Sequence, residues 1–134
     1  MNRIVFDSYA FIALFRHEPG GPFVEEQLLN IAKGDTEGWL SSVNLGEVFY
    51  MMARKGNVED AASAVSDILQ WPVIIEEPTT DFCLLAAELK IHHKISYADA
   101  FAAALTIQKK ATLITGDKEF NSLIKETNFK VKYI

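Results

Sequence analysis

The spacing of hydrophobic and polar positions along the chain changes repeatedly between the short runs of strands and the longer repeat of amphipathic helices. Five short apolar or alternating runs predict strands: Arg3–Phe6, Trp39–Ser41, Pro72–Ile75, Ala111–Ile114 and Phe129–Tyr133. The last run alternates apolar and basic residues, which is typical of a half-exposed edge strand.

Helical patterns fill the intervals between these runs. The predicted helices are Tyr9–Phe15, a second helix ending near Gly34 after a breaker at Pro19–Pro22, Val43–Lys55, Val58–Leu69, Thr79 or Thr80 to Lys90, Tyr97–Lys110 and a short helix after Asp117. Gly56 suits a helix C-cap and Asn57 an N-cap. Strands separated by helices indicate an α/β fold whose sheet is mostly parallel.

Two helices fall between the third and fourth predicted strands, and both cannot run antiparallel to the sheet. We expect the helix from Tyr97 to be the regular one, and the preceding helix to cross obliquely.

Length and composition indicate one domain over residues 1–134, with one core, since 49% of the residues are hydrophobic. The single cysteine, Cys83, lies in an apolar run and is predicted to be a buried structural thiol. With no internal disulfide, no secretory signal pattern and no apolar run of about 20 residues, we expect a cytoplasmic protein with no membrane association.

Four acids occupy related places in the predicted elements. Asp7 directly follows the first strand and Asp117 lies just past the fourth, whereas Glu47 and Asp99 fall in the opening turns of helices. The carboxyl ends of parallel strands meet at one edge of a sheet, and the helices that follow strands start there. We therefore expect the four acids to converge.

Each acid also has an ordinary structural interpretation. Asn44-x-x-Glu47 and Ser96-x-x-Asp99 both match a capping box, while Asp7 and Asp117 suit loop or N-cap positions. Two carboxylates ~5 Å apart repel by about 3 kcal/mol at an effective dielectric constant of 20, which exceeds what one cap contributes. A cluster of all four would therefore require a cation.

Oxygen ligands favour Mg²⁺, with Mn²⁺ as the alternative, over zinc, for which no set of Cys and His has suitable spacing. The net charge of −5 argues against a nucleic-acid partner. If four of the negative charges are metal ligands, however, the rest of the chain is close to neutral, and the metal supplies positive charge at the site.

Four stretches of the sequence resemble the PIN domain, and within it the VapC-like toxins of prokaryotic toxin–antitoxin pairs. These stretches are residues 4–8, 42–48, 96–100 and 113–120. The resemblance implies a PIN-like three-layer α/β/α fold with about five strands, and an acidic quartet of Asp7, Glu47, Asp99 and Asp117. It also implies a Mg²⁺-dependent endoribonuclease that forms a homodimer and is inhibited by an antitoxin.

By the same resemblance, the polar residues Ser8, Asn44 and Thr115 orient ligands or water around the quartet. We expect Asp7 and Asp99 to be the principal metal ligands, Asp117 to bind directly or through water, and Glu47 to bind a second ion or position water.

Several basic side chains are candidates for contact with substrate phosphates. They are Lys90, His92, His93 and Lys94 before the Asp99 helix, and Lys118 after Asp117. The competing interpretation is a solvated helix end, and the histidines fit no part of the PIN pattern.

The aromatic and apolar residues divide into two groups. Phe11, Phe15 and Trp71 are predicted to lie in the core. Residues 49–52, Phe-Tyr-Met-Met, cannot all face one side of a helix, so part should be core and the rest a dimer or antitoxin surface.

Two other functions use the same residues. An aspartyl-phosphate protein, of the receiver or haloacid-dehalogenase type, would use Asp7 as a phosphoacceptor. The chain has Tyr9 where a dehalogenase needs a second Asp, and it lacks the late Lys-Pro of a receiver. A catalytically inactive PIN-like binding module is the other alternative, which the presence of all four acids disfavours.

Overall fold

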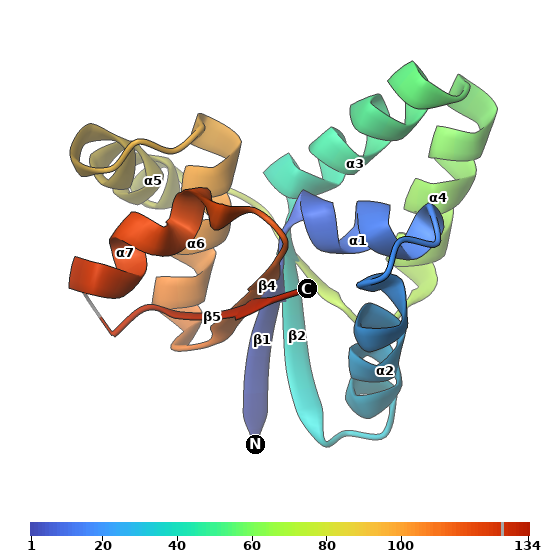
Figure 1. Cartoon of the computed structure of the whole chain (residues 1–134), viewed down its shortest axis with the longest axis horizontal. Coiled ribbons are helices and arrows are strands. Elements are labelled where there is room, and N and C mark those ends of the chain that lie inside the picture. The colour runs from blue at the N-terminus through green and yellow to red at the C-terminus, as the bar shows by residue number, and fades with distance from the viewer. Residues whose placement is uncertain (127) are drawn as a thin grey trace.

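The computed structural model describes residues 1–126 and 128–134, and a five-stranded sheet lies at its centre (Figure 1). The strands are β1 (Asn2–Phe6), β2 (Thr36–Ser41), β3 (Ile74–Glu76), β4 (Thr112–Thr115) and β5 (Lys130–Tyr133). Their order in the sheet is β3-β2-β1-β4-β5, and every neighbouring pair is parallel. All five carboxyl ends therefore lie at one edge of the sheet.

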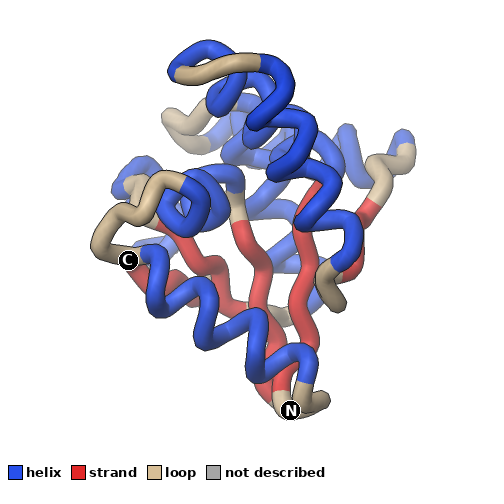
Figure 2. Tube along the Cα trace, turned by 90° about the vertical axis from the view of Figure 1, so that its right-hand side faces the viewer, coloured by secondary structure: helices blue, strands red, loops and turns tan. Residues whose placement is uncertain are grey.

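Helices cover both faces of this sheet (Figure 2). The helices are α1 (Ser8–Phe15), α2 (Gly21–Ala32), α3 (Ser42–Lys55), α4 (Val58–Gln70), α5 (Thr80–His92), α6 (Tyr97–Lys109), the 3₁₀ turn η1 (Lys118–Phe120) and α7 (Asn121–Glu126). Helices α1 to α4 contribute to one hydrophobic cluster, and α5, α6, η1 and α7 to the other. This arrangement confirms the predicted three-layer α/β/α fold.

The alternation of side chains along β1 places residues in both clusters. Val5 lies in the cluster of α5 to α7, while Ile4 and Phe6 lie in the cluster of α1 to α4. Phe6 packs against Phe11 of α1, with ring centroids 4.9 Å apart. Both faces of the central strand are thus buried, as a parallel sheet requires.

The three aromatic residues predicted for the core do pack there. Phe11 is fully buried, and Phe15 and Trp71 are partly buried against the same cluster. The rings of Phe15 and Trp71 stack with centroids 5.6 Å apart. This contact joins the end of α1 to the end of α4.

Of the two helices between β3 and β4, the one from Tyr97 is the helix that packs on the sheet, as predicted. Helix α6 packs against β1, β2 and β4, whereas α5 packs against α6. Residues 99–106 of α6 are all buried, because the helix lies between the sheet and α5. The side chain of Asp99 is therefore carried into the protein interior by its helix.

Some predicted boundaries are wrong for identifiable reasons. Strand β2 begins at Thr36 rather than Trp39, and includes Gly38, where an added Cβ would lie 2.3 Å from a side-chain atom of Ile31. Strand β3 begins at Ile74, since Pro72 has no N–H to donate to a neighbouring strand. Pro22 occupies the first turn of α2 and does not interrupt it.

Two predictions about apolar residues are refined by the structure. Cys83 is partly buried against the α5–α6 cluster, and is not enclosed as predicted. In α3, Met51 and Met52 pack on the core while Phe49 and Tyr50 are exposed, so the predicted division of residues 49–52 is confirmed. No helix in the described part of the chain is both long and apolar enough to cross a lipid bilayer.

Candidate functional site

Asp7 combines a helix-capping role with a place at the carboxyl edge of the sheet. Its carboxylate Oδ1 accepts the backbone N–H of Ala10 at 2.9 Å, and so caps α1. Its own N–H donates to the carbonyl of Ile114 at 3.4 Å, which ties it to the end of β4. The side chain is buried, and cap and site are therefore compatible at this position.

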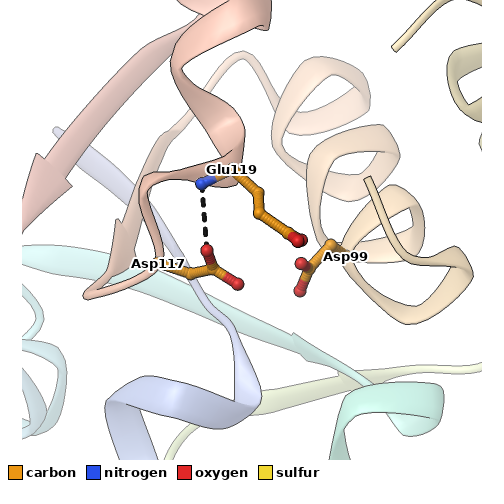
Figure 3. A group of neighbouring side chains, drawn as sticks. All are labelled: Asp99, Asp117 and Glu119. Carbon is orange, nitrogen blue, oxygen red and sulfur yellow. Dashed lines mark hydrogen bonds between the residues drawn. The ribbon is translucent and has the colours of Figure 1, made fainter. Parts of the chain in front are cut away.

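Asp117 caps the 3₁₀ turn that follows β4. Its Oδ1 accepts the N–H of Glu119 at 2.9 Å, and its N–H donates to the hydroxyl of Thr115 at 2.9 Å. The turn places the backbone N–H of Glu119 at Asp117 and directs the side chain of Glu119 toward Asp99 (Figure 3).

The tightest group of acids consists of Asp99, Asp117 and Glu119. One carboxylate oxygen from each lies within 4.8 Å of the other two, and the three side chains point toward one another (Figure 3). Glu119 was not among the predicted site residues. The signal for it was its position two residues after Asp117, in the turn that Asp117 caps.

Burial and mutual repulsion change the protonation of two of these acids. Loss of solvation is the main cause that raises the pKa of Asp99 to about 9, and the neighbouring Glu119 and Asp117 contribute to the same rise. For Asp7, loss of solvation outweighs the lowering effect of the Thr115 hydroxyl and the Ala10 N–H, and the pKa is raised to about 7. The metal-free site therefore holds protons that a cation would displace.

The four predicted acids are close enough for their charges to contribute to the raised pKa values of Asp7 and Asp99. The charges of Glu47 and Asp117 raise the pKa of Asp7, and the charge of Asp7 raises that of Asp99. The structure thus brings Asp7, Glu47, Asp99 and Asp117 to one region. Asp7 and Glu47 lie outside the tightest group found among the described residues.

The predicted capping box at Asn44 is wrong. Ser41 caps α3 by accepting the N–H of Val43, so Asn44 lies inside the first turn. The carboxylate of Glu47 accepts a hydrogen bond from the Asn44 side-chain amide at 2.9 Å. Glu47 is consequently held by a side chain, and not by the backbone of a cap.

Asn44 connects two of the helices that carry acids. Its Nδ2 also donates to the carbonyl of Ala98 at 3.1 Å, directly before Asp99. Its side-chain oxygen Oδ1 is buried and has no partner among the described residues. Asn44 thereby orients Glu47, links α3 to α6, and keeps one acceptor oxygen unused near the acids.

Only one of the two hydrogen bonds of the capping box predicted at Asp99 is found among the residues that the structure describes. Ser96 caps α6, and its hydroxyl accepts the N–H of Asp99 at 3.1 Å, as predicted. The Asp99 carboxylate is directed to Glu119 and Asp117 (Figure 3). Ser8, the remaining predicted polar neighbour, is buried at the start of α1.

The basic residues predicted to contact substrate phosphates differ in their exposure and in the hydrogen bonds they already make. Lys94 and Lys118 are exposed, and Lys118 follows Asp117 in the chain. Lys90 donates to the carbonyl of Ile95 at 2.9 Å, which fixes the turn before α6. His93 contacts the hydroxyl of Ser122 at 3.1 Å, and His92 is exposed at the end of α5.

These donors fit a hard divalent cation. Carboxylate oxygens of Asp99, Asp117 and Glu119, with Asp7 and Glu47 close by, form the oxygen-rich environment that Mg²⁺ and Mn²⁺ prefer. Burial is the main cause of the raised pKa values of Asp7 and Asp99, and the neighbouring carboxylates add to it. Fold and site together define an α/β protein with a carboxylate site at the ends of parallel strands.

The PIN domain family model matches residues 4–126, and the chain belongs to this family. The family predicted from the sequence is therefore confirmed. A search of curated proteins finds no match.

Solved structures of VapC and VapBC proteins share the fold. VapBC2 from Rickettsia felis, bound to a promoter DNA fragment, has a TM-score of 0.75 at 19% identity, covering 98% of each chain. VapC20 from Mycobacterium tuberculosis, a toxin that cleaves the sarcin-ricin loop, has a TM-score of 0.74 at 21% identity, covering 90% of this chain and 94% of that one. VapBC-1 from nontypeable Haemophilus influenzae has a TM-score of 0.68 at 18% identity, covering 98% and 97%.

Proposed function

We propose that this protein is a Mg²⁺-dependent endoribonuclease and the toxin of a type II toxin–antitoxin pair, acting in the cytoplasm. The observation that carries the proposal is the meeting of Asp99, Asp117 and Glu119 within 4.8 Å, beside the buried Asp7. Carboxylates this close together repel one another unless a cation or a proton neutralises part of their charge. The fold shared with VapC toxins supports the class of activity.

The side chains have distinct roles in this proposal. Asp7, Asp99 and Asp117 would hold the cation, with Glu119 as a further oxygen donor and Glu47 on the side of Asp7. A bound Mg²⁺, or Mn²⁺ in its place, would lower the pKa of a water molecule and neutralise charge that develops on the scissile phosphate.

The neighbours of the acids position them. The Thr115 hydroxyl donates to Asp7 and accepts from the Asp117 backbone, so it keeps two carboxylates in register. The Asn44 amide orients Glu47. Ser8 would orient water or ligand from the start of α1, and the exposed Lys94 and Lys118 would contact substrate phosphates.

Partners follow from the same assignment. We infer a cognate antitoxin and a homodimer, with the exposed Phe49 and Tyr50 of α3 as part of one of these interfaces. Aromatic side chains are enriched in the buried centre of protein interfaces. Light scattering of Phe49→Asp against wild type tests the dimer, and capture of the protein encoded beside the gene tests the antitoxin.

RNA cleavage by the purified protein tests the activity. Wild type, Asp7→Asn and Asp99→Asn are incubated with total cellular RNA in Mg²⁺ and in EDTA, and the new RNA ends are mapped. We expect cleavage by wild type in Mg²⁺ only, with a loss of at least a hundredfold in both variants. Asp67→Asn, which removes an exposed acid of α4, is the matched control and should cleave normally.

Two results would contradict the proposal. Cleavage that persists in EDTA or in Asp7→Asn would exclude the carboxylate site as its source. Absence of cleavage by wild type, with retained binding to a partner protein, would support an inactive PIN-like module.

A further inference from the structure

We propose that a small cavity beside the acidic site binds one unstacked nucleobase of a single-stranded substrate, with guanine preferred. This inference rests on the proposed nuclease function. It assigns Tyr9 as the stacking surface and Glu18 as the group that reads the base edge.

The cavity has a volume of about 150 Å³, and is lined by Tyr9, Ala13, Glu18, Pro19, Gly20 and Ile134. It is smaller than the ~300 Å³ at which pockets for drug-sized ligands begin, so it suits one flat group. Its place is at the carboxyl edge of the sheet, where the C-terminus of the chain reaches the turn between α1 and α2 (Figure 1). Tyr9 and Pro19 are exposed, so the cavity is open to solvent.

Tyr9 brings this cavity next to the acids. It lies two residues after Asp7, and its ring rests on Gly116, which directly precedes Asp117. A Cβ at Gly116 would lie only 2.3 Å from Cε1 of the ring, so the glycine is what allows this approach. The ring is nevertheless 43% exposed. An aromatic ring held rigidly but left open is suited to stacking with a base.

The C-terminal turn of α1 positions Glu18 at the cavity. His17 has a φ of 55°, in the left-handed region, and its N–H donates to Leu14. The N–H of Glu18 then donates to the carbonyl of Ala13 at 2.9 Å, which completes a Schellman motif. The carbonyl of Glu18 accepts the N–H of Gly21 at 2.8 Å, so its backbone is held on both sides.

The carboxylate of Glu18 is an available acceptor. Glu18 is half-buried, and it is the one side-chain carboxylate among the residues that line the cavity. None of the hydrogen bonds or ion pairs found in residues 1–126 and 128–134 uses it. A half-buried carboxylate next to an aromatic ring is therefore free to accept donors from a ligand.

Base chemistry selects guanine for such a site. A carboxylate accepts two parallel hydrogen bonds, and guanine presents N1–H and N2–H side by side on its Watson–Crick edge. Adenine and cytosine present a single amino group there, next to a ring acceptor. Uracil flanks its one N–H with two carbonyl oxygens, which a carboxylate repels.

Short single-stranded RNAs that differ only by G, A, C or U at one position test the subsite. Cleavage rates of wild type, Tyr9→Leu, Tyr9→Phe and Glu18→Gln are compared in Mg²⁺, and binding is measured by fluorescence anisotropy. We expect Tyr9→Leu to raise KM roughly tenfold on every RNA, with kcat little changed, while Tyr9→Phe behaves as wild type. Glu18→Gln should lower the preference for guanine by about tenfold.

Glu25→Gln, an exposed glutamate of α2, is the matched control for charge and should change neither quantity. Wild-type cleavage of all four RNAs at equal rates, or an unchanged KM in Tyr9→Leu, would overturn the subsite and leave the nuclease proposal standing. If wild type neither cleaves nor binds any RNA, both proposals fail together. Thermal unfolding of each variant separates loss of binding from loss of folding, and Glu18→Gln tests the site should Tyr9→Leu unfold.

Discussion

Replacing Asp99 by Asn should stabilise the metal-free protein, and the gain should grow as the pH rises. Burial, with help from Glu119 and Asp117, raises the pKa of Asp99 from 3.8 to about 9. Between these two values the unfolded chain has released a proton that the folded protein still holds. The equilibrium constant for unfolding of wild type therefore rises by about tenfold per pH unit from this one group.

Asparagine has nearly the same shape and no proton to release, so the variant lacks this dependence. From pH 5 to pH 7 it should gain about 3 kcal/mol relative to wild type. Urea unfolding in EDTA at pH 5, 6 and 7, followed by tryptophan fluorescence, measures the difference directly. Asp67→Asn, at an exposed position of α4, is the control for replacing a carboxylate at the surface.

The result that would refute this reasoning is a stability difference that does not change with pH. A uniform loss of about 1 kcal/mol in Asp99→Asn would mean that the carboxylate acts as part of a helix cap. In Mg²⁺ the order should reverse, because the ion binds the folded wild type and displaces its protons.

Three further predictions follow from the packing and the site. Phe11→Ala should cost about 3–5 kcal/mol in urea unfolding, since the side chain is fully buried, whereas Leu69→Ala, at an exposed position of α4, should cost less than about 1 kcal/mol; equal losses would contradict the assigned core. Asn44→Leu should weaken Mg²⁺ binding by roughly 10- to 100-fold in calorimetric titration, because Glu47 loses the hydrogen bond that orients it. Unchanged affinity would show that the Asn44 amide does not position the acids. Gly116→Ala should impair substrate binding by pushing the Tyr9 ring aside, yet have little further effect in Tyr9→Ala; effects that simply add would mean that ring and glycine act independently.

Much of the fold could be predicted from the sequence because its determinants are local. The runs around Val5 and Leu113 are apolar over a few residues and end at polar groups, which is enough to predict strands. Ser96 and Asn57 cap the helices they were expected to cap, since a cap involves residues only three positions apart. Where a boundary was missed, as at Thr36, the strand extends through pairing with β1.

The acids Asp7, Glu47, Asp99 and Asp117 could likewise be placed near one another from their positions after strands or at the starts of helices. Parallel strands all end at the same edge, so topology alone brings these residues together. From the sequence alone, the α/β class and the sheet edge at which these four acids gather could therefore be predicted.

The detailed arrangement of the acids follows from contacts between segments that are far apart in the sequence. Glu119 joins Asp99 across a gap of 20 residues because the turn after β4 folds back over α6 (Figure 3). Asn44 bonds to Ala98, 54 residues away, and Glu18 lines the same cavity as Tyr9 because α1 closes in a left-handed turn. Such contacts depend on how the helices pack on the sheet, to within about an ångström. Local sequence patterns do not predict distances between segments that are far apart in the chain.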